Sequence, residues 1–146
     1  MLTPEDSMPF NLDRFIAAQD RIYDDVLREL RAGRKTSHWM WFIFPQLQGL
    51  GRSETAQYYG IASLDEARAY LAHPVLGARL RECTALVNAH GGTRIDTILG
   101  HVDALKFRSS MTLFAAAAVG DAPFATALAT FHDGEADQAT VELLDK

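Results

Sequence analysis

The fold of this chain is decided by residues 11–33, which read NLDRFIAAQDRIYDDVLRELRAG. The apolar residues that recur at helical spacing on one face of this segment are Phe15, Ile22, Val26 and Leu30. Acidic residues lie at its start and on its opposite face, as in an amphipathic helix. Gly33 follows the last apolar residue, where glycine commonly ends a helix. The pattern predicts one helix that stops at Gly33.

Further segments with helical patterns follow, separated by glycine and proline. They cover residues 63–72, 74–89, 103–118, 121–132 and 137–144, with shorter helical turns near 54–59 and 94–99. Ser63 and Glu66 have the spacing of a capping box, and Asp121 precedes Pro123 as an N-cap would. We therefore predict an all-α fold, a single compact domain of about six or seven helices. It spans residues 12–146 behind a loose lead-in over residues 1–11.

The predicted core is drawn from the apolar faces of these helices. It consists of Phe15, Ile22, Val26, Leu30, Leu76, Leu80, Leu86, Met111, Leu113, Phe114, Phe124, Leu128 and Phe131. A chain of 146 residues with 48% apolar and 23% charged residues is typical of one globular domain.

Charge and cysteine content exclude several classes of protein. Lys and Arg number 14 against 19 Asp and Glu, a net charge of −5, which argues against general nucleic-acid binding. The single cysteine, Cys83, cannot form an internal disulfide, and its apolar neighbours favour a buried hydrophobe over a catalytic thiol. Glu5 and Asp6 stand where a signal peptide would carry basic residues. No run of ~20 apolar residues, the length needed to cross a membrane, follows. We expect a cytoplasmic protein without a membrane span.

The second informative stretch is residues 33–46, which read GRKTSHWMWFIFPQ and contain both tryptophans of the chain. The aromatic rings alone could simply pack between helices in the core. Residues 39–44 are also the one segment whose pattern suits a strand. The polar groups beside them need partners, because an unpaired buried polar group costs about 1–3 kcal/mol. A bound ligand is one such partner, and acidic side chains or helix C-termini are others.

Candidate site residues come from this stretch and from two later clusters. Aromatic rings can stack on a planar group, and cations can hold negative charge. His38 is the candidate catalytic residue, since histidine titrates near neutral pH, although a structural hydrogen-bonding role is equally open. The candidate ligand-binding residues are Arg34, Lys35, Trp39, Trp41, Gln46, Arg52, Lys106, Ser109 and Ser110. No histidine has the helical spacing of a metal ligand pair, so we predict no metal and no cofactor.

The arrangement of these motifs resembles the bacterial family catalogued as domain of unknown function 1810. The resemblance is carried by Gly33-Arg34-Lys35, the string from Ser37 to Gln46, Gly49-Leu50-Gly51, His73-Pro74-Val75-Leu76-Gly77 and Lys106 with Ser109-Ser110. It implies a mainly helical single domain and no established activity. Members are sometimes labelled calpastatin, but core-forming periodicity throughout this chain argues against an unstructured inhibitor. A remoter similarity, through Lys106-Phe107, is to a helical family linked to NAD and ADP-ribose metabolism.

These observations lead to three hypotheses. The first is a pocket around Arg34–Gln46 that binds or processes a small anionic ligand of the nucleotide, sugar phosphate or ADP-ribose type. The alternative is a protein-interaction module that uses an exposed aromatic stretch without catalysis. In the third, the aromatic stretch is only core. Catalysis, oligomeric state and physiological partner stay open.

Overall fold

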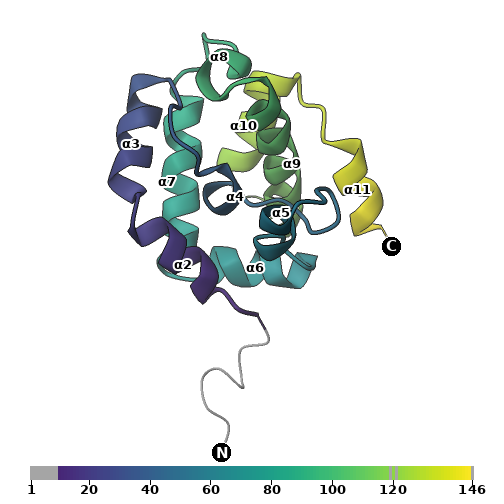
Figure 1. Cartoon of the computed structure of the whole chain (residues 1–146). Helices are drawn as coiled ribbons and strands as arrows, with labels where there is room; N and C mark the ends of the chain where they lie inside the picture. The colour runs from purple at the N-terminus through teal and green to yellow at the C-terminus, as the bar shows by residue number, and fades with distance from the viewer. Residues whose placement is uncertain (1–9, 119, 121, 146) are drawn as a thin grey trace, which may run out of the picture.

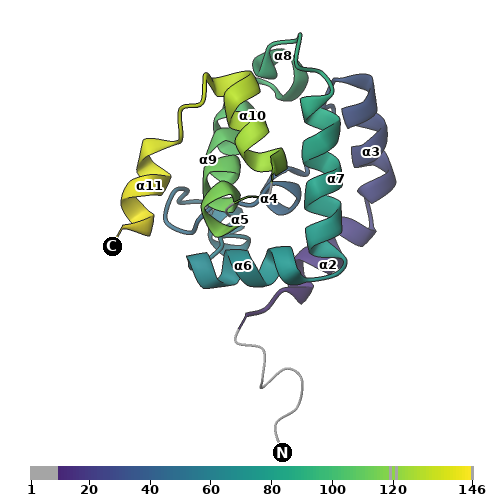
Figure 2. The ribbon, with the colours of Figure 1, turned by 180° about the vertical axis from the view of Figure 1, so that it is seen from behind.

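Helix α9 (His101–Ala117) runs through the middle of the fold, and helices from both before and after it in the chain pack against it (Figures 1 and 2). The computed structural model describes residues 10–118, 120 and 122–145. Residues 1–9 of the predicted lead-in and Asp121, the predicted N-cap, lie outside the described residues. The remaining helices are α2 (Asp13–Asp20), α3 (Tyr23–Ala32), α4 (Met40–Ile43), α5 (Glu54–Tyr58), α6 (Leu64–Ala72), α7 (Leu76–Asn88), α8 (Ile95–Leu99), α10 (Ala122–His132) and α11 (Gln138–Leu144).

The all-α fold class is confirmed, but the number of helices is not. The described part of the chain contains ten helices rather than six or seven. Its only β-type pairing is an isolated bridge between Leu47 and Ile61. None of its helices is long and apolar enough to cross a membrane.

Residues 11–33 form two helices, so the prediction of a single helix was wrong. α2 ends at Asp20, and Ile22 has φ −134°, outside the helical range. The bend lets the two segments bury different faces. Phe15 of α2 packs edge-on against Tyr70 of α6, with ring centroids 5.1 Å apart, whereas α3 packs against α7.

The candidate strand over residues 39–44 is instead the short helix α4. It directs its flanking rings inward. The ring of Phe44 meets that of Phe107 of α9 edge-on at 5.0 Å, and Trp39 lies beside Phe44 at 6.2 Å. A helical turn suits these residues because it places Trp39, Met40, Ile43 and Phe44 together in the core, where each is at most 3% exposed.

Most of the predicted core is buried. Ile22, Leu86 and Phe131 are the exceptions, since they are half-buried and pack against the core from outside. Cys83 is fully buried, and burial raises the pKa of its thiol to about 12. The thiol therefore stays protonated, as a buried hydrophobe would.

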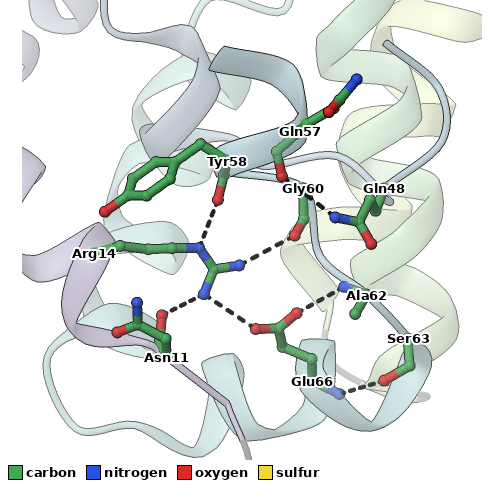
Figure 3. Close-up of polar contacts among 9 residues, drawn as sticks. All are labelled: Asn11, Arg14, Gln48, Gln57, Tyr58, Gly60, Ala62, Ser63 and Glu66. Carbon is green, nitrogen blue, oxygen red and sulfur yellow. Dashed lines mark hydrogen bonds and ion pairs between the residues drawn. The ribbon is translucent and has the colours of Figure 1, made fainter. Parts of the chain in front are cut away.

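The Ser63 cap is confirmed, with one difference in the role of Glu66. The Ser63 hydroxyl accepts a hydrogen bond from the Glu66 N–H at 3.1 Å. Glu66 reaches back to the N–H of Ala62, at 2.6 Å, rather than to that of Ser63. Its other carboxylate oxygen is occupied by Arg14, 3.2 Å away, so the side chain serves the preceding loop as well as the helix (Figure 3).

Arg14 ties α2 to the loop that precedes α6. Its guanidinium donates to the carbonyls of Tyr58 at 2.8 Å and Gly60 at 3.1 Å, and also to that of Asn11 (Figure 3). The Arg14 and Glu66 side chains are only 8% and 4% exposed. This buried ion pair holds residues 58–62 in place. Through the hydrogen bond from the Gln48 N–H to the Ile61 carbonyl, at 2.7 Å, these residues in turn hold the loop 45–53 that follows α4.

Candidate functional site

The segment from Gly33 to Trp39 begins at a helix end that strongly favours glycine. α3 stops at Gly33, whose φ of 73° is left-handed. A Cβ at this position would lie 3.0 Å from the ring of His90. That ring caps α3 from outside, because its Nε2 lies 2.8 Å from the Leu30 carbonyl oxygen. The chain therefore leaves α3 in a fixed direction.

Glu29, on the buried face of α3, holds the next residues. Its carboxylate accepts hydrogen bonds from the N–H groups of Thr36 at 2.6 Å and Ser37 at 2.9 Å. It also accepts from the Ser37 hydroxyl at 2.7 Å and the Trp39 indole N–H at 3.1 Å. Burial alone would raise the pKa of this carboxyl, but these donors outweigh it and lower the pKa to about 2. Glu29 is the partner that the polar groups around Trp39 require.

Lys35 is the first member of a charged cluster on the outer side of this segment. Its N–H donates to the Ile98 carbonyl at 2.7 Å, which joins the segment to α8. Its ammonium lies 2.9 Å from Asp103 of α9 and also donates to the Ser37 carbonyl. On the other side of Asp103, the Lys106 ammonium is 3.1 Å away, one turn further along α9.

Trp41 completes the cluster. The Lys106 ammonium lies 4.0 Å from the centroid of its ring, within the range of a cation–π contact. Trp41 is half-buried, and the outer edge of its ring is 3.9 Å from where a Cβ of Gly51 would be. We call Lys35, Trp41, Asp103 and Lys106 the lysine–tryptophan cluster.

Asp103 remains ionised within this cluster. Burial favours its neutral form, but the hydrogen bonds and charges of Lys35 and Lys106 act more strongly and lower its pKa. Two ammonium groups thus share one carboxylate. The cluster keeps one net positive charge in a chain whose formal charge is −5.

The other predicted site residues lie in varied surroundings. Arg34, His38 and Arg52 are exposed, and Gln46 is half-buried with its carbonyl accepting from the Ile61 N–H at 2.8 Å. Trp39 is 1% exposed and belongs to the core. The structure therefore brings Lys35, Trp39, Trp41 and Lys106 together. In the described residues, no hydrogen bond or ion pair joins the side chains of Arg34, His38, Gln46 or Arg52 to them.

The two serines of α9 are both buried. The Ser109 hydroxyl donates to the Leu105 carbonyl at 3.2 Å, one turn earlier in the helix. The Ser110 hydroxyl oxygen has no hydrogen-bond partner among the described residues. Ser110 follows Lys106 by four residues, so it lies on the same face of α9.

Glu29 and Asp103 were not predicted as site residues, although both leave a signal in the sequence. Glu29 is a charged residue between Val26 and Leu30, on the apolar face of a helix. A charge in such a position must be paired. Asp103 precedes Lys106 by three residues, which is the spacing of a helical ion pair. Neither signal identifies the distant partner.

The comparisons with known proteins agree with the family resemblance. A family model described as protein of unknown function (DUF1810) matches residues 9–144. The chain belongs to this family. Its fold is similar to the crystal structure of the conserved hypothetical protein Rv1873 from the bacterium Mycobacterium tuberculosis. The two are 54% identical with a TM-score of 0.93, and the match covers 95% of this chain and 99% of that one. No curated protein matches the chain.

Proposed function

We propose that this protein binds a small anionic ligand, of the nucleotide, sugar phosphate or ADP-ribose type, at the lysine–tryptophan cluster. The observation that carries the proposal is that Lys35 and Lys106 share the single carboxylate of Asp103. One positive charge is thereby left for a ligand, beside a half-buried indole. Hydrogen bonds from an ammonium to a phosphate are among the stronger ones in proteins.

The indole supplies the second part of the site. Trp41 has a flat apolar face on which a base can stack, which is worth ~1–3 kcal/mol per base. Arg34 and His38 are exposed neighbours of the largely buried Lys35, and we place them at the rim of the site. If a reaction follows binding, His38 is the group that we assign to proton transfer.

The alternative, an interaction module built on an exposed aromatic stretch, has less support. Trp39, Met40, Ile43 and Phe44 are buried, which leaves only Trp41 and Phe42 partly exposed. A protein-binding anchor needs several apolar side chains at the surface.

Thermal shift and isothermal titration with ADP-ribose, AMP and ribose 5-phosphate test the proposal. A ligand at 100 times its Kd should stabilise the native state by about 2.7 kcal/mol. Lys106→Gln should weaken binding by ~1.5–3 kcal/mol, because it removes a charged contact. It should also reduce the quenching of Trp41 fluorescence by the ligand.

The matched control is Arg28→Gln, which removes a cation from an exposed i,i+3 pair on α3. It should leave affinity unchanged. If none of the three compounds shifts the melting temperature, or if both variants lose affinity equally, the cluster is not a ligand site. Lys35 and Lys106 would then act only as counter-ions of Asp103.

A further inference from the structure

A second candidate site lies elsewhere on α9, in a hollow of about 390 Å³. We call it the α8–α10 hollow, because the glycine loop 91–94, the start of α8, α9 and the end of α10 form its walls. Neither Trp39 nor Trp41 lines it. Its volume is within the range of small-molecule sites.

Two guanidinium groups flank this hollow. Arg108 donates hydrogen bonds to the carbonyls of Glu135 at 2.9 Å and Ala136 at 3.0 Å, and it forms an ion pair with the Glu135 carboxylate at 3.5 Å. In the described chain its Nη1 has no hydrogen-bond acceptor. Arg94 is 84% exposed, and within the described residues its guanidinium forms one ion-pair contact, with Asp96 at 4.0 Å. The planar fork of an arginine matches carboxylate and phosphate oxygens. The residues that line the hollow thus carry two guanidinium groups against one carboxylate, that of Asp96. The exposed Glu135 offsets part of the Arg108 charge from outside the hollow.

His132 lines the same hollow and has an unsatisfied atom. Its Nε2 is buried and has no hydrogen-bond partner among the described residues. Burial lowers the pKa of this imidazole, and the nearby Arg108 lowers it further, against the opposing effect of Asp96 and Asp133. Because this nitrogen is shielded from solvent, a ligand in the hollow would reach it only after a local side-chain movement. The hydrogen bond then made would pair an otherwise unsatisfied polar atom, which is favourable.

The hollow also has apolar walls beside its polar ones. Leu105 is 54% exposed and lines one side, and Ile95 and Phe131 line others. Val102, one turn before Leu105 on α9, is 63% exposed. Gly92, in the glycine loop, leaves open space, since a Cβ there would meet nothing within 4 Å. A ligand with an apolar body would cover exposed side chains while its anionic group faced the arginines.

We infer that the α8–α10 hollow binds a small organic anion, a carboxylate or a phosphate monoester with an apolar or aromatic body, held by Arg94, Arg108 and His132. This site is separate from the lysine–tryptophan cluster and does not depend on it. The arginines select the charge, His132 contributes a hydrogen bond, and Leu105 and Phe131 contact the body of the ligand.

The test is an NMR titration of the histidine ring signals with phenyl phosphate, benzoate, inorganic phosphate and benzyl alcohol. Phenyl phosphate or benzoate should shift the His132 signals and raise its pKa, because an anion stabilises the imidazolium. The relative affinities of these two identify the preferred head group. Inorganic phosphate and benzyl alcohol, which each lack one half of the ligand, should bind at least about tenfold more weakly.

Variants separate the site from non-specific attraction. Arg94→Gln should weaken binding about tenfold or more while leaving the fold unchanged, because Arg94 is exposed. Arg68→Gln, at an exposed pair with Asp65 on α6, is the matched control and should bind normally. Equal binding by wild type and Arg94→Gln would overturn the inference. So would equal responses to phenyl phosphate and benzyl alcohol, or His132 signals that do not move.

Discussion

At the scale of single residues, Glu29 decides the course of the segment that carries both tryptophans. One carboxylate accepts four hydrogen bonds, from two backbone N–H groups, a hydroxyl and the Trp39 indole. The donors come from three different residues, so losing this acceptor would leave several groups unpaired, among them the buried Trp39 indole N–H. The cost should therefore be much larger than that of a surface glutamate.

We expect Glu29→Gln to lower the free energy of unfolding by ~2–3 kcal/mol, since an amide offers one acceptor oxygen and no charge. Urea denaturation followed by tryptophan fluorescence measures the change. Glu142→Gln, an exposed position on α11, serves as the control and should stay within ~0.5 kcal/mol of the wild type. A change in Glu29→Gln no larger than in this control would contradict the role assigned to Glu29.

Glu29 should also make stability depend on pH in the acid range. Its pKa in the folded protein is about 2, below the ordinary value of 4.5. The unfolded chain takes up the proton first, so the stabilisation is present above about pH 4.5 and is lost as pH falls towards 2. Between these limits, the wild type should lose up to about 3 kcal/mol more than Glu29→Gln. Parallel acid-dependence curves for the two proteins would refute this.

At the scale of the helices, the end of α3 fixes where Lys35 lies. Gly33 is left-handed and in contact with His90, and the Lys35 N–H then meets α8. These local contacts place the Lys35 side chain opposite Asp103 of α9. A shift of the helix end would move Lys35 out of the cluster.

Gly33→Ala should therefore destabilise the fold by ~1–3 kcal/mol, because a Cβ is strained at positive φ and contacts the His90 ring. Gly92→Ala provides a matched comparison in the loop after α7, where the added methyl meets open space. This substitution should leave the free energy of unfolding unchanged or raise it by ~0.4–1 kcal/mol, because alanine lowers the conformational entropy of the unfolded chain. Thermal unfolding of both variants checks the contrast, and equal effects would show that φ and space at Gly33 do not matter.

At the scale of the whole molecule, Arg14 and Glu66 connect parts of the chain that are far apart in sequence (Figure 3). α2, the loop before α6 and α6 itself meet at this buried pair. Replacing Arg14 would leave the Glu66 carboxylate buried without its cation and the carbonyls of Tyr58 and Gly60 without their donor. The effect should extend from the N-terminal helix to the loop beside Trp41.

A double-mutant cycle with Arg14→Leu and Glu66→Gln should give a coupling energy of ~1–3 kcal/mol. Arg14→Leu alone should cost ~3–5 kcal/mol. The same cycle on the exposed pair Arg28 and Asp25 should give about 0.5 kcal/mol or less. Urea unfolding of the six variants measures both cycles, and similar coupling in the two pairs would show that burial does not strengthen the first.

What the sequence determined was local. Apolar periodicity and capping residues predicted the helices after residue 53, the helix end at Gly33 and the N-cap at Ser63. Each of these features depends on residues only a few positions apart. Lys35, Trp41 and Lys106 were also candidate site residues from their side-chain chemistry alone. The same local information could not show whether their charges were free.

Only the tertiary structure decided how these pieces meet. The break at Ile22 lets α2 and α3 bury different faces. The helical turn α4 places the ring of Phe44 against that of Phe107 of α9. Asp103 pairs with Lys35 because α3 and α8 bring the two segments together, and no spacing in the sequence encodes that contact. The physical reason is that burial and charge pairing depend on distances across the core, whereas helix formation depends mainly on neighbours along the chain.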